Sequence, residues 1–186
     1  MIALTVMCIM FCGDIRAQIV DDKENARVFV QKFYDWYGKV YTRQRHITAQ
    51  YEIIKHNPQY LDKVLLNALL ADERAWARYP RAIIGLDFDP FTNTLDTRKG
   101  YQTGLVVQKA GKFFVDVHDI ESGRSKKDVL SANLILTAEV AYIHGHWIFE
   151  NFVYPRPYAL HNYGGNLLGI LDSLHKDRIK QGYEKP

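Results

Sequence analysis

An acidic segment at residues 86–96 carries the side chains whose types are best suited to contacting a ligand. Asp87 and Asp89 are two residues apart, and Asp96 follows after a polar stretch. Carboxylates at this spacing resemble a calcium loop in outline, because a hard cation needs several oxygen ligands in a flexible ring. However, Phe91 occupies the third ligand position, and the glycine and glutamate that such a loop needs are missing. The segment predicts a loop that caps backbone amides or contacts a ligand, and it predicts no metal site.

Two histidines flank Gly145 in a predicted turn, where they could be mistaken for a chelating pair. The ring of His146 is expected on one strand face, while His144 adopts the turn conformation, so the two do not converge. Zinc needs three or four ligands. Cys8 and Cys12 are the two cysteines of the chain, and both precede residue 18. We therefore expect neither a metal nor another cofactor.

Asp116 and His118 share one face of a predicted strand, and an Asp beside a His is typical of acid–base chemistry. That face is expected to be the outer one, together with Leu105 and Phe114, where a solvated strand is the simpler interpretation. No phosphate-binding glycine loop, G-x-S-x-G or H-E-x-x-H motif occurs. We predict no catalytic residue, and a weak hydrolase or isomerase that uses Asp116 with His118 stays the less favoured alternative.

The elements that position these side chains begin with a predicted antiparallel sheet. Apolar and polar residues alternate between Tyr101 and Tyr154 around two glycine turns. This pattern predicts four strands, at residues 101–109, 112–120, about 129–143 and 147–154.

A two-residue turn at residues 144–145 fixes the register of the last two predicted strands. It places Ala138 opposite Asn151 on the dry face and Glu139 opposite Glu150 on the wet face. A buried amide without partners costs on the order of 1–3 kcal/mol. Asn151 is therefore expected to bond to backbone, to water or to a ligand.

Helices are predicted before and after the sheet. Apolar residues at helical spacing predict a long helix at residues 21–43 and a short one at residues 48–56. Asn57 followed by Pro58 predicts the start of a third helix that ends at Tyr79. A last helix is expected from Asn166. Together these patterns predict an α+β fold.

Length and composition predict one exported domain. The apolar run at residues 1–17 is too short to span a bilayer and has the length of a signal peptide. Residues 18–182 are long enough for one core, and residues 183–186 are expected to fray. Phe11 precedes Cys12 where a lipobox needs a small residue, so no stable membrane anchor is expected after cleavage. The formal net charge is +3, and basic and acidic residues are interspersed along the chain. This distribution does not favour a nucleic-acid-binding surface.

Three segments together resemble a known family. They are the aromatic stripe at residues 33–37, the segment 86–91 followed by Asp96, and residues 145–152, which read Gly-His-Trp-Ile-Phe-Glu-Asn-Phe. This order is similar to the exported bacterial proteins grouped as DUF3828. The resemblance implies an NTF2-like (cystatin-like) cone, in which a curved antiparallel sheet wraps a long N-terminal helix and leaves a pocket at its wide end. It implies a periplasmic or secreted protein without an established reaction.

The expected function is that of a non-enzymatic domain that binds a small molecule, a peptide or a partner protein in this pocket. An envelope immunity or inhibitor protein that acts by surface contact is the alternative, and a homodimer is possible. The expected binding residues are Tyr34, Asp87, Asp89, Asp96, Tyr101 and Asn151.

Overall fold

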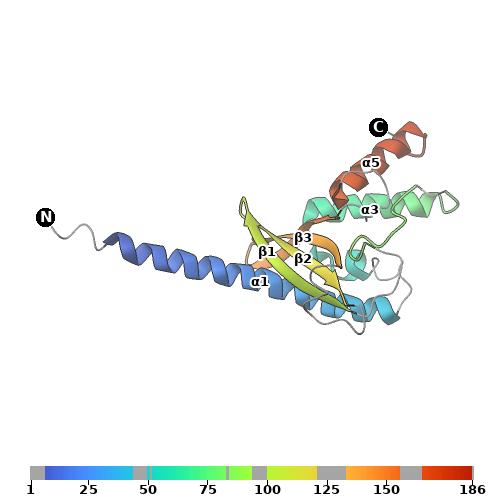
Figure 1. Cartoon of the computed structure of the whole chain (residues 1–186). Helices are drawn as coiled ribbons and strands as arrows, with labels where there is room; N and C mark the ends of the chain where they lie inside the picture. The colour runs from blue at the N-terminus through green and yellow to red at the C-terminus, as the bar shows by residue number, and fades with distance from the viewer. Residues whose placement is uncertain are drawn as a thin grey trace.

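The chain folds into a curved four-stranded antiparallel sheet with helices packed around it, which confirms the α+β class (Figure 1). The computed structural model describes residues 7–43, 50, 52–82, 84–93, 100–120, 133–155 and 165–185, and the side chains of the first helix from Asp21 to Val40. The helical elements are α1 (Met7–Arg43), η1 (Glu52–His56), η2 (Pro58–Tyr60), α3 (Lys63–Arg78) and α5 (Leu167–Lys180).

The sheet has the strand order β1-β2-β3-β4 and follows the predicted alternation closely. Its strands are β1 (Tyr101–Lys109), β2 (Lys112–Asp119), β3 (Leu134–Ile143) and β4 (His146–Val153). Both hairpins have two-residue turns whose central residues have positive φ, which suits the right-handed twist of the strands. In the second turn His144 has φ 53° and Gly145 has φ 85°. The prediction of tight glycine turns is confirmed.

The predicted register between β3 and β4 holds near the turn and then shifts at a bulge. Val140 pairs with Phe149 as expected, but Glu139 pairs with Asn151 and Ala138 with Phe152. The prediction that Asn151 faces Ala138 is therefore wrong. The bulge brings Phe152 into the dry face of the sheet and leaves Asn151 on the outer face.

An ion-pair cluster on the outer face accompanies this bulge. The Nζ atom of Lys112 lies 2.6 Å from Oε1 of Glu139 and 3.0 Å from Oε2 of Glu150. Two carboxylates that would repel each other across the strands thus share one ammonium group. This sharing gives a physical reason for Glu150 to occupy the extra position of the bulge.

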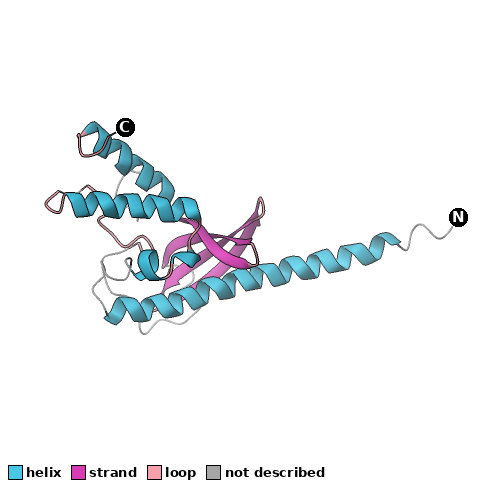
Figure 2. Ribbon diagram, turned by 180° about the vertical axis from the view of Figure 1, so that it is seen from behind, coloured by secondary structure: helices cyan, strands magenta, loops and turns pink. Residues whose placement is uncertain are grey.

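Helix α1 lies along the inner face of the sheet, and its N-terminal part extends past the strands (Figure 1, Figure 2). Ala26, Val30, Phe33 and Tyr37 recur at helical spacing and are fully buried. The ring of Phe33 lies 4.6 Å from that of Phe149, measured between centroids. The apolar stripe of the helix therefore packs against β4 in the core, to which β2, β3, α3 and α5 also contribute.

The third helix begins later than the sequence predicts. Asn57 and Pro58 start only the short 3-10 turn η2, and the N-cap of α3 is Asp62, whose Oδ2 accepts a 2.7 Å hydrogen bond from the amide of Val64. The chain between them joins the sheet, because the amide of Asp62 donates to the carbonyl of Phe149 over 2.8 Å. This pairing with the edge of β4 interrupts the helix that the Asn-Pro signal predicts.

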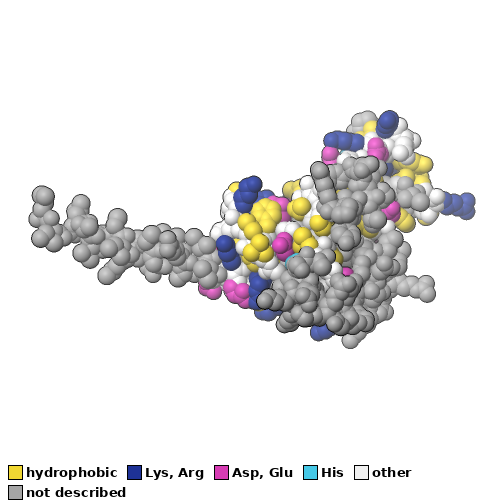
Figure 3. Space-filling model, in the orientation of Figure 1, with side chains coloured by type: hydrophobic (Ala, Val, Ile, Leu, Met, Phe, Trp, Pro, Cys, Tyr) yellow, Lys and Arg dark blue, Asp and Glu magenta, His cyan; other side chains and the backbone are white. Residues whose placement is uncertain are grey.

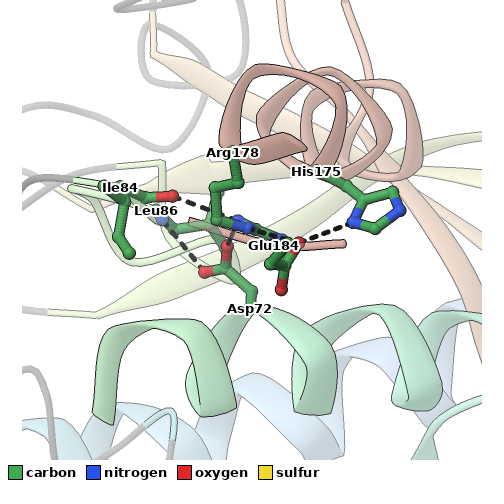
Figure 4. Close-up of polar contacts among 6 residues, drawn as sticks. All are labelled: Asp72, Ile84, Leu86, His175, Arg178 and Glu184. Carbon is green, nitrogen blue, oxygen red and sulfur yellow. Dashed lines mark hydrogen bonds and ion pairs between the residues drawn. The ribbon is translucent and has the colours of Figure 1, made fainter. Parts of the chain in front are cut away.

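A buried ion pair joins α3 to α5 (Figure 4). The Nη1 atom of Arg178 donates to Oδ1 of Asp72 over 2.7 Å and to the carbonyl of Ile84 over 3.1 Å. The second carboxylate oxygen of Asp72 accepts from the amide of Leu86 at 3.0 Å. Burial raises the pKa of the Asp72 carboxyl, while these hydrogen bonds and Arg178 act to lower it.

The residues that follow α5 pack back onto it. Glu184 accepts a 3.0 Å hydrogen bond from Nε of Arg178, and the ring of Tyr183 lies 4.9 Å from that of Tyr79. Although residues 183–186 were expected to fray, Tyr183 and Glu184 have defined partners. Within the described ranges, no helix combines the length and apolar character needed to cross a bilayer.

Candidate functional site

Asp89 lies in the interior, whereas the adjacent acidic residue of the segment lies outside. Only 3% of Asp89 is exposed. Its Oδ2 accepts a 2.6 Å hydrogen bond from the hydroxyl of Tyr37, and its Oδ1 accepts from the amide of Phe91 at 2.8 Å. Asp87 is exposed, and Asp96 lies outside the described residues. The acidic segment thus contributes one buried acid to the core.

Tyrosines from both sides hold the same segment. The hydroxyl of Tyr34 donates to the carbonyl of Phe91 over 2.7 Å, and that of Tyr154 donates to the carbonyl of Pro90 over 2.8 Å. The ring of Tyr101 lies 5.2 Å from that of Tyr34. The structure therefore brings together Tyr34, Asp89 and Tyr101, three of the residues predicted to bind a ligand.

Burial is the main cause of the pKa shifts of Asp89 and of the tyrosines around its segment. Desolvation raises the pKa of Asp89 to about 7, although the hydrogen bonds from Tyr37 and the Phe91 amide lower it. Desolvation also raises the pKa of Tyr34, Tyr37 and Tyr154 well above the ordinary tyrosine value. A carboxylic acid enclosed by phenols and backbone groups anchors a loop, and its oxygens do not face solvent.

Asn151 has its partners at the start of α5. Its Oδ1 accepts from the amides of Phe152 and Leu168 at 3.0 and 3.1 Å, and its Nδ2 donates to Asn166 over 3.1 Å. Asn166 is the N-cap of α5. Backbone and the helix cap therefore satisfy this amide, as the first of the sequence-based alternatives expects, and these partners are not those of Asp89.

Asp116 and His118 lie on the outer face of the sheet, as predicted, but His118 is buried there, so the expected solvated face is wrong for this residue. Asp116 accepts a 2.8 Å hydrogen bond from the hydroxyl of Thr137. His118 is 4% exposed, and its Nε2 would lie only 2.7 Å from a Cβ atom added to Gly104. Desolvation lowers the pKa of this imidazole. Because the two side chains contact neighbouring strands, the arrangement does not favour the hydrolase or isomerase alternative.

A continuous row of part-exposed aromatic rings runs along one border of the inner face. It links Trp36 to Tyr60 at 6.0 Å, Tyr60 to Phe29 at 6.2 Å, Phe29 to Trp147 at 6.4 Å, and Trp147 to Tyr142 at 5.3 Å, all between ring centroids. Tyr142 is 59% exposed and the other four are half-buried. We call these five residues the aromatic row.

Two lysines border the aromatic row on helix α1. Lys32 follows Phe29 by three positions and Lys39 follows Trp36 by three, so each lysine neighbours its ring on the helix surface. Both are exposed, and neither forms an ion pair with a described residue. The row therefore combines apolar faces with positive charge.

The sequence patterns do not identify the aromatic row. Helical spacing shows which residues face inward, but it does not separate a buried ring from one at the border of the buried face. The seven-residue interval between Phe29 and Trp36 is the signal that could have suggested a common edge.

Comparison with known proteins gives no relative for this chain. No protein-family model, no curated protein and no solved structure matches it. The family resemblance seen in the sequence therefore stays a prediction. In the part of the chain that the structure describes, no group of three or more His, Cys, Asp or Glu side chains could hold a metal ion.

Proposed function

We propose that the chain is an exported, non-enzymatic binding domain with an NTF2-like cone fold, similar to the DUF3828 proteins. In this proposal it acts in the periplasm or after secretion, and its ligand contacts the aromatic row. The observation that carries the proposal is the unbroken line of five part-exposed rings from α1, η2 and the β3–β4 hairpin. Trp and Tyr dominate the binding energy of many interfaces, because a large apolar surface is combined with a polar atom.

The interior of the sheet supports placing the ligand at this border. Phe33, Phe91, Phe149 and Phe152 are at most 1% exposed and their rings contact one another. Side chains therefore fill the interior between α1 and β4. The row packs against this interior and still has apolar area left to bury.

The charge beside the row favours an anionic ligand. Lys32 and Lys39 can meet carboxylates or other acidic groups of a molecule that lies along Phe29 and Trp36. Such exposed charges contribute more to encounter and orientation than to affinity. The proposed ligand is thus an extended molecule with flat or apolar groups and negative charge.

The three tryptophans of the chain allow a direct test. Trp36 and Trp147 belong to the row, whereas Trp76 lies on α3 against Gly85. We would screen the Trp76→Phe protein against arrays of acidic peptides and acidic oligosaccharides, and then titrate each hit by tryptophan fluorescence. The proposal expects that ligand binding quenches or shifts the tryptophan fluorescence. Trp147→Leu and Tyr142→Ala should each weaken the affinity for the ligand at least about tenfold, a typical effect of removing an interface anchor.

Asp87→Asn provides the matched control, because it changes an exposed residue of the segment that the sequence favoured. It should leave the titration unchanged. A ligand whose affinity falls in Asp87→Asn and is unchanged in Trp147→Leu contradicts the proposed position of the site.

An immunity or inhibitor protein that acts by surface contact is the second candidate. Leu105 and Val107 favour it, because they are 67% and 48% exposed on the outer side of β1. A specific complex with a secreted toxin or hydrolase, lost in Val107→Lys and kept in Trp147→Leu, would support this candidate over the first.

A further inference from the structure

Strand β1 is an edge of the sheet, and the hairpin geometry tells which of its backbone groups remain available. Lys109 and Lys112 flank the two-residue turn and pair with each other. In an antiparallel ladder, successive residues direct their N–H and C=O groups alternately toward and away from the neighbouring strand. The backbone groups of Val107 and Lys109 are therefore directed to β2, and those of Val106 and Gln108 are directed away from the sheet.

Helix α1 covers only the beginning of this edge. The side-chain amide of Gln31 donates to the carbonyl of Tyr101 over 3.1 Å and accepts from the amide of Thr103 at 2.8 Å. The ladder then shifts at a bulge between Thr103 and Val106. Past this bulge, no described residue forms a hydrogen bond with the outward backbone groups of Val106 or Gln108.

The side chains on this half of the strand are also apolar and exposed. Leu105 and Val107 face the outer side, and Val107 pairs with Phe114 of β2. The space-filling view shows hydrophobic side chains gathered over the strands, with Lys and Arg side chains beside them (Figure 3). An edge that offers both unpaired backbone groups and apolar side chains is a template for another strand.

We infer that β1 pairs antiparallel with β1 of a second copy of this chain, about a two-fold axis at Val107. This register pairs Val106 with the partner's Gln108, and the symmetry repeats that pair on the other side of the axis. Each such pair exchanges two backbone hydrogen bonds, which gives about four in all. Val107 then faces the partner's Val107, and the two copies form one continuous sheet.

The pattern of side chains favours a second copy of the chain as the partner strand. In the antiparallel register, apolar side chains meet at the centre and the charged Lys109 side chains are kept apart. The register pairs Leu105 with the partner's Lys109, so that the two Lys109 side chains lie at opposite ends of the interface. Leu105 and Val107 of both copies then form one apolar stripe on the outer face. An interface of this kind, with the same patch on both subunits, is the usual geometry of a symmetric dimer.

The mass of the full chain in solution tests the inference, by light scattering after gel filtration over a range of concentrations. The wild-type chain should have the mass of a dimer. Val107→Lys should convert it to a monomer, since it places two ammonium groups against each other at the axis. Val64→Lys is the matched control, because Val64 is 64% exposed on α3, away from β1, and this variant should remain dimeric.

Val106→Pro is a second variant, which removes an outward backbone donor together with a half-buried side chain. Proline removes an N–H that faces away from β2, a position at which edge strands tolerate it. This variant should also be monomeric, with circular dichroism like that of the wild type. In the wild-type chain, hydrogen exchange at the amides of Val106 and Gln108 should slow as the protein concentration rises.

A wild-type chain that is monomeric at every concentration overturns the inference, even if the edge binds a strand of another protein. Equal dissociation of the Val64→Lys and Val107→Lys variants also overturns it, as does a dimer that survives both β1 variants. None of these results bears on the aromatic row, whose test is the fluorescence titration.

Discussion

The hydroxyl of Tyr37 donates a 2.6 Å hydrogen bond to Oδ2 of Asp89, a residue 52 positions later in the chain. This bond fastens the loop after α3 to helix α1 inside the core, since both side chains are buried. Burial raises the pKa of Asp89 to about 7, although the bond from Tyr37 acts to lower it. Stability should therefore depend on pH in a range where surface carboxylates have finished titrating.

Asp89→Asn should remove a pH dependence of stability between about pH 4 and pH 7. The folded-state pKa of Asp89 lies above the unfolded value of 3.8, so the folded state holds a proton that the unfolded state releases in this range. Unfolding free energy then falls as pH rises, by on the order of 4 kcal/mol from this group. The variant should be more stable than the wild type at pH 8, as urea unfolding at several pH values would measure.

Asp87→Asn is the control for that measurement, because Asp87 is exposed in the same loop. Its stability should follow the wild-type pH profile. Identical profiles for Asp89→Asn and the wild type would show that Asp89 is ionised in the folded protein, contrary to the expected result.

Breaking the buried pair between Arg178 and Asp72 should be strongly destabilising. Arg178→Met leaves the Asp72 carboxylate buried without its cation, and losses of about 3–5 kcal/mol are typical of such a change. Lys176→Met removes the exposed pair with Asp172 on the same helix, where both side chains are more than half exposed, and should cost less than about 1 kcal/mol. Thermal or urea unfolding should show a clearly larger loss of stability in Arg178→Met than in Lys176→Met. Similar losses of stability would contradict the expected contribution of the buried pair.

Gly85→Ala should destabilise the fold through the indole of Trp76. A Cβ atom added at this position would lie 2.0 Å from Cδ1 of Trp76 and 2.8 Å from Oδ2 of Asp72. The indole must move, and overpacking of this kind typically costs about 1–3 kcal/mol. The double variant Gly85→Ala with Trp76→Ala should recover part of the loss if the indole is the cause, which unfolding of both proteins and of Trp76→Ala alone would establish.

Asn166→Ala should loosen the start of α5. Its Oδ1 accepts from the amide of Gly169 at 2.9 Å and from Nδ2 of Asn151 at 3.1 Å. Loss of an N-cap typically costs about 1 kcal/mol, and Asn166→Asp should retain the cap while changing the contact with Asn151. Hydrogen exchange in α5 should increase in the alanine variant, and unchanged exchange there would contradict the capping role.

The strands and turns could be predicted because alternation and glycine position act locally. The start of α5 at Asn166 follows from local capping in the same way. The bulge at Glu150 and the late start of α3 could not be predicted, since the first involves Lys112 on another strand and the second involves pairing with Phe149.

The aromatic row was not predicted, whereas some of the residues that the sequence selected for a site do lie together, although in the interior. Sequence patterns selected Tyr34, Asp89 and Tyr101, and these residues do lie together. Their burial depends on how α1 and the loop after α3 pack, which no local pattern states. The ion pair of Arg178 joins residues 106 positions apart, beyond the reach of any spacing rule.

The bond between Gln31 and strand β1 has a consequence for how far α1 can slide. A primary amide can donate one hydrogen bond and accept another, as the Gln31 side chain does with the carbonyl of Tyr101 and the amide of Thr103. Advancing the helix by a single turn would bring Asp35 to this place, and an ionised carboxylate has no proton to offer the Tyr101 carbonyl. The Gln31 side chain thereby fixes the position of α1 along its own axis relative to β1.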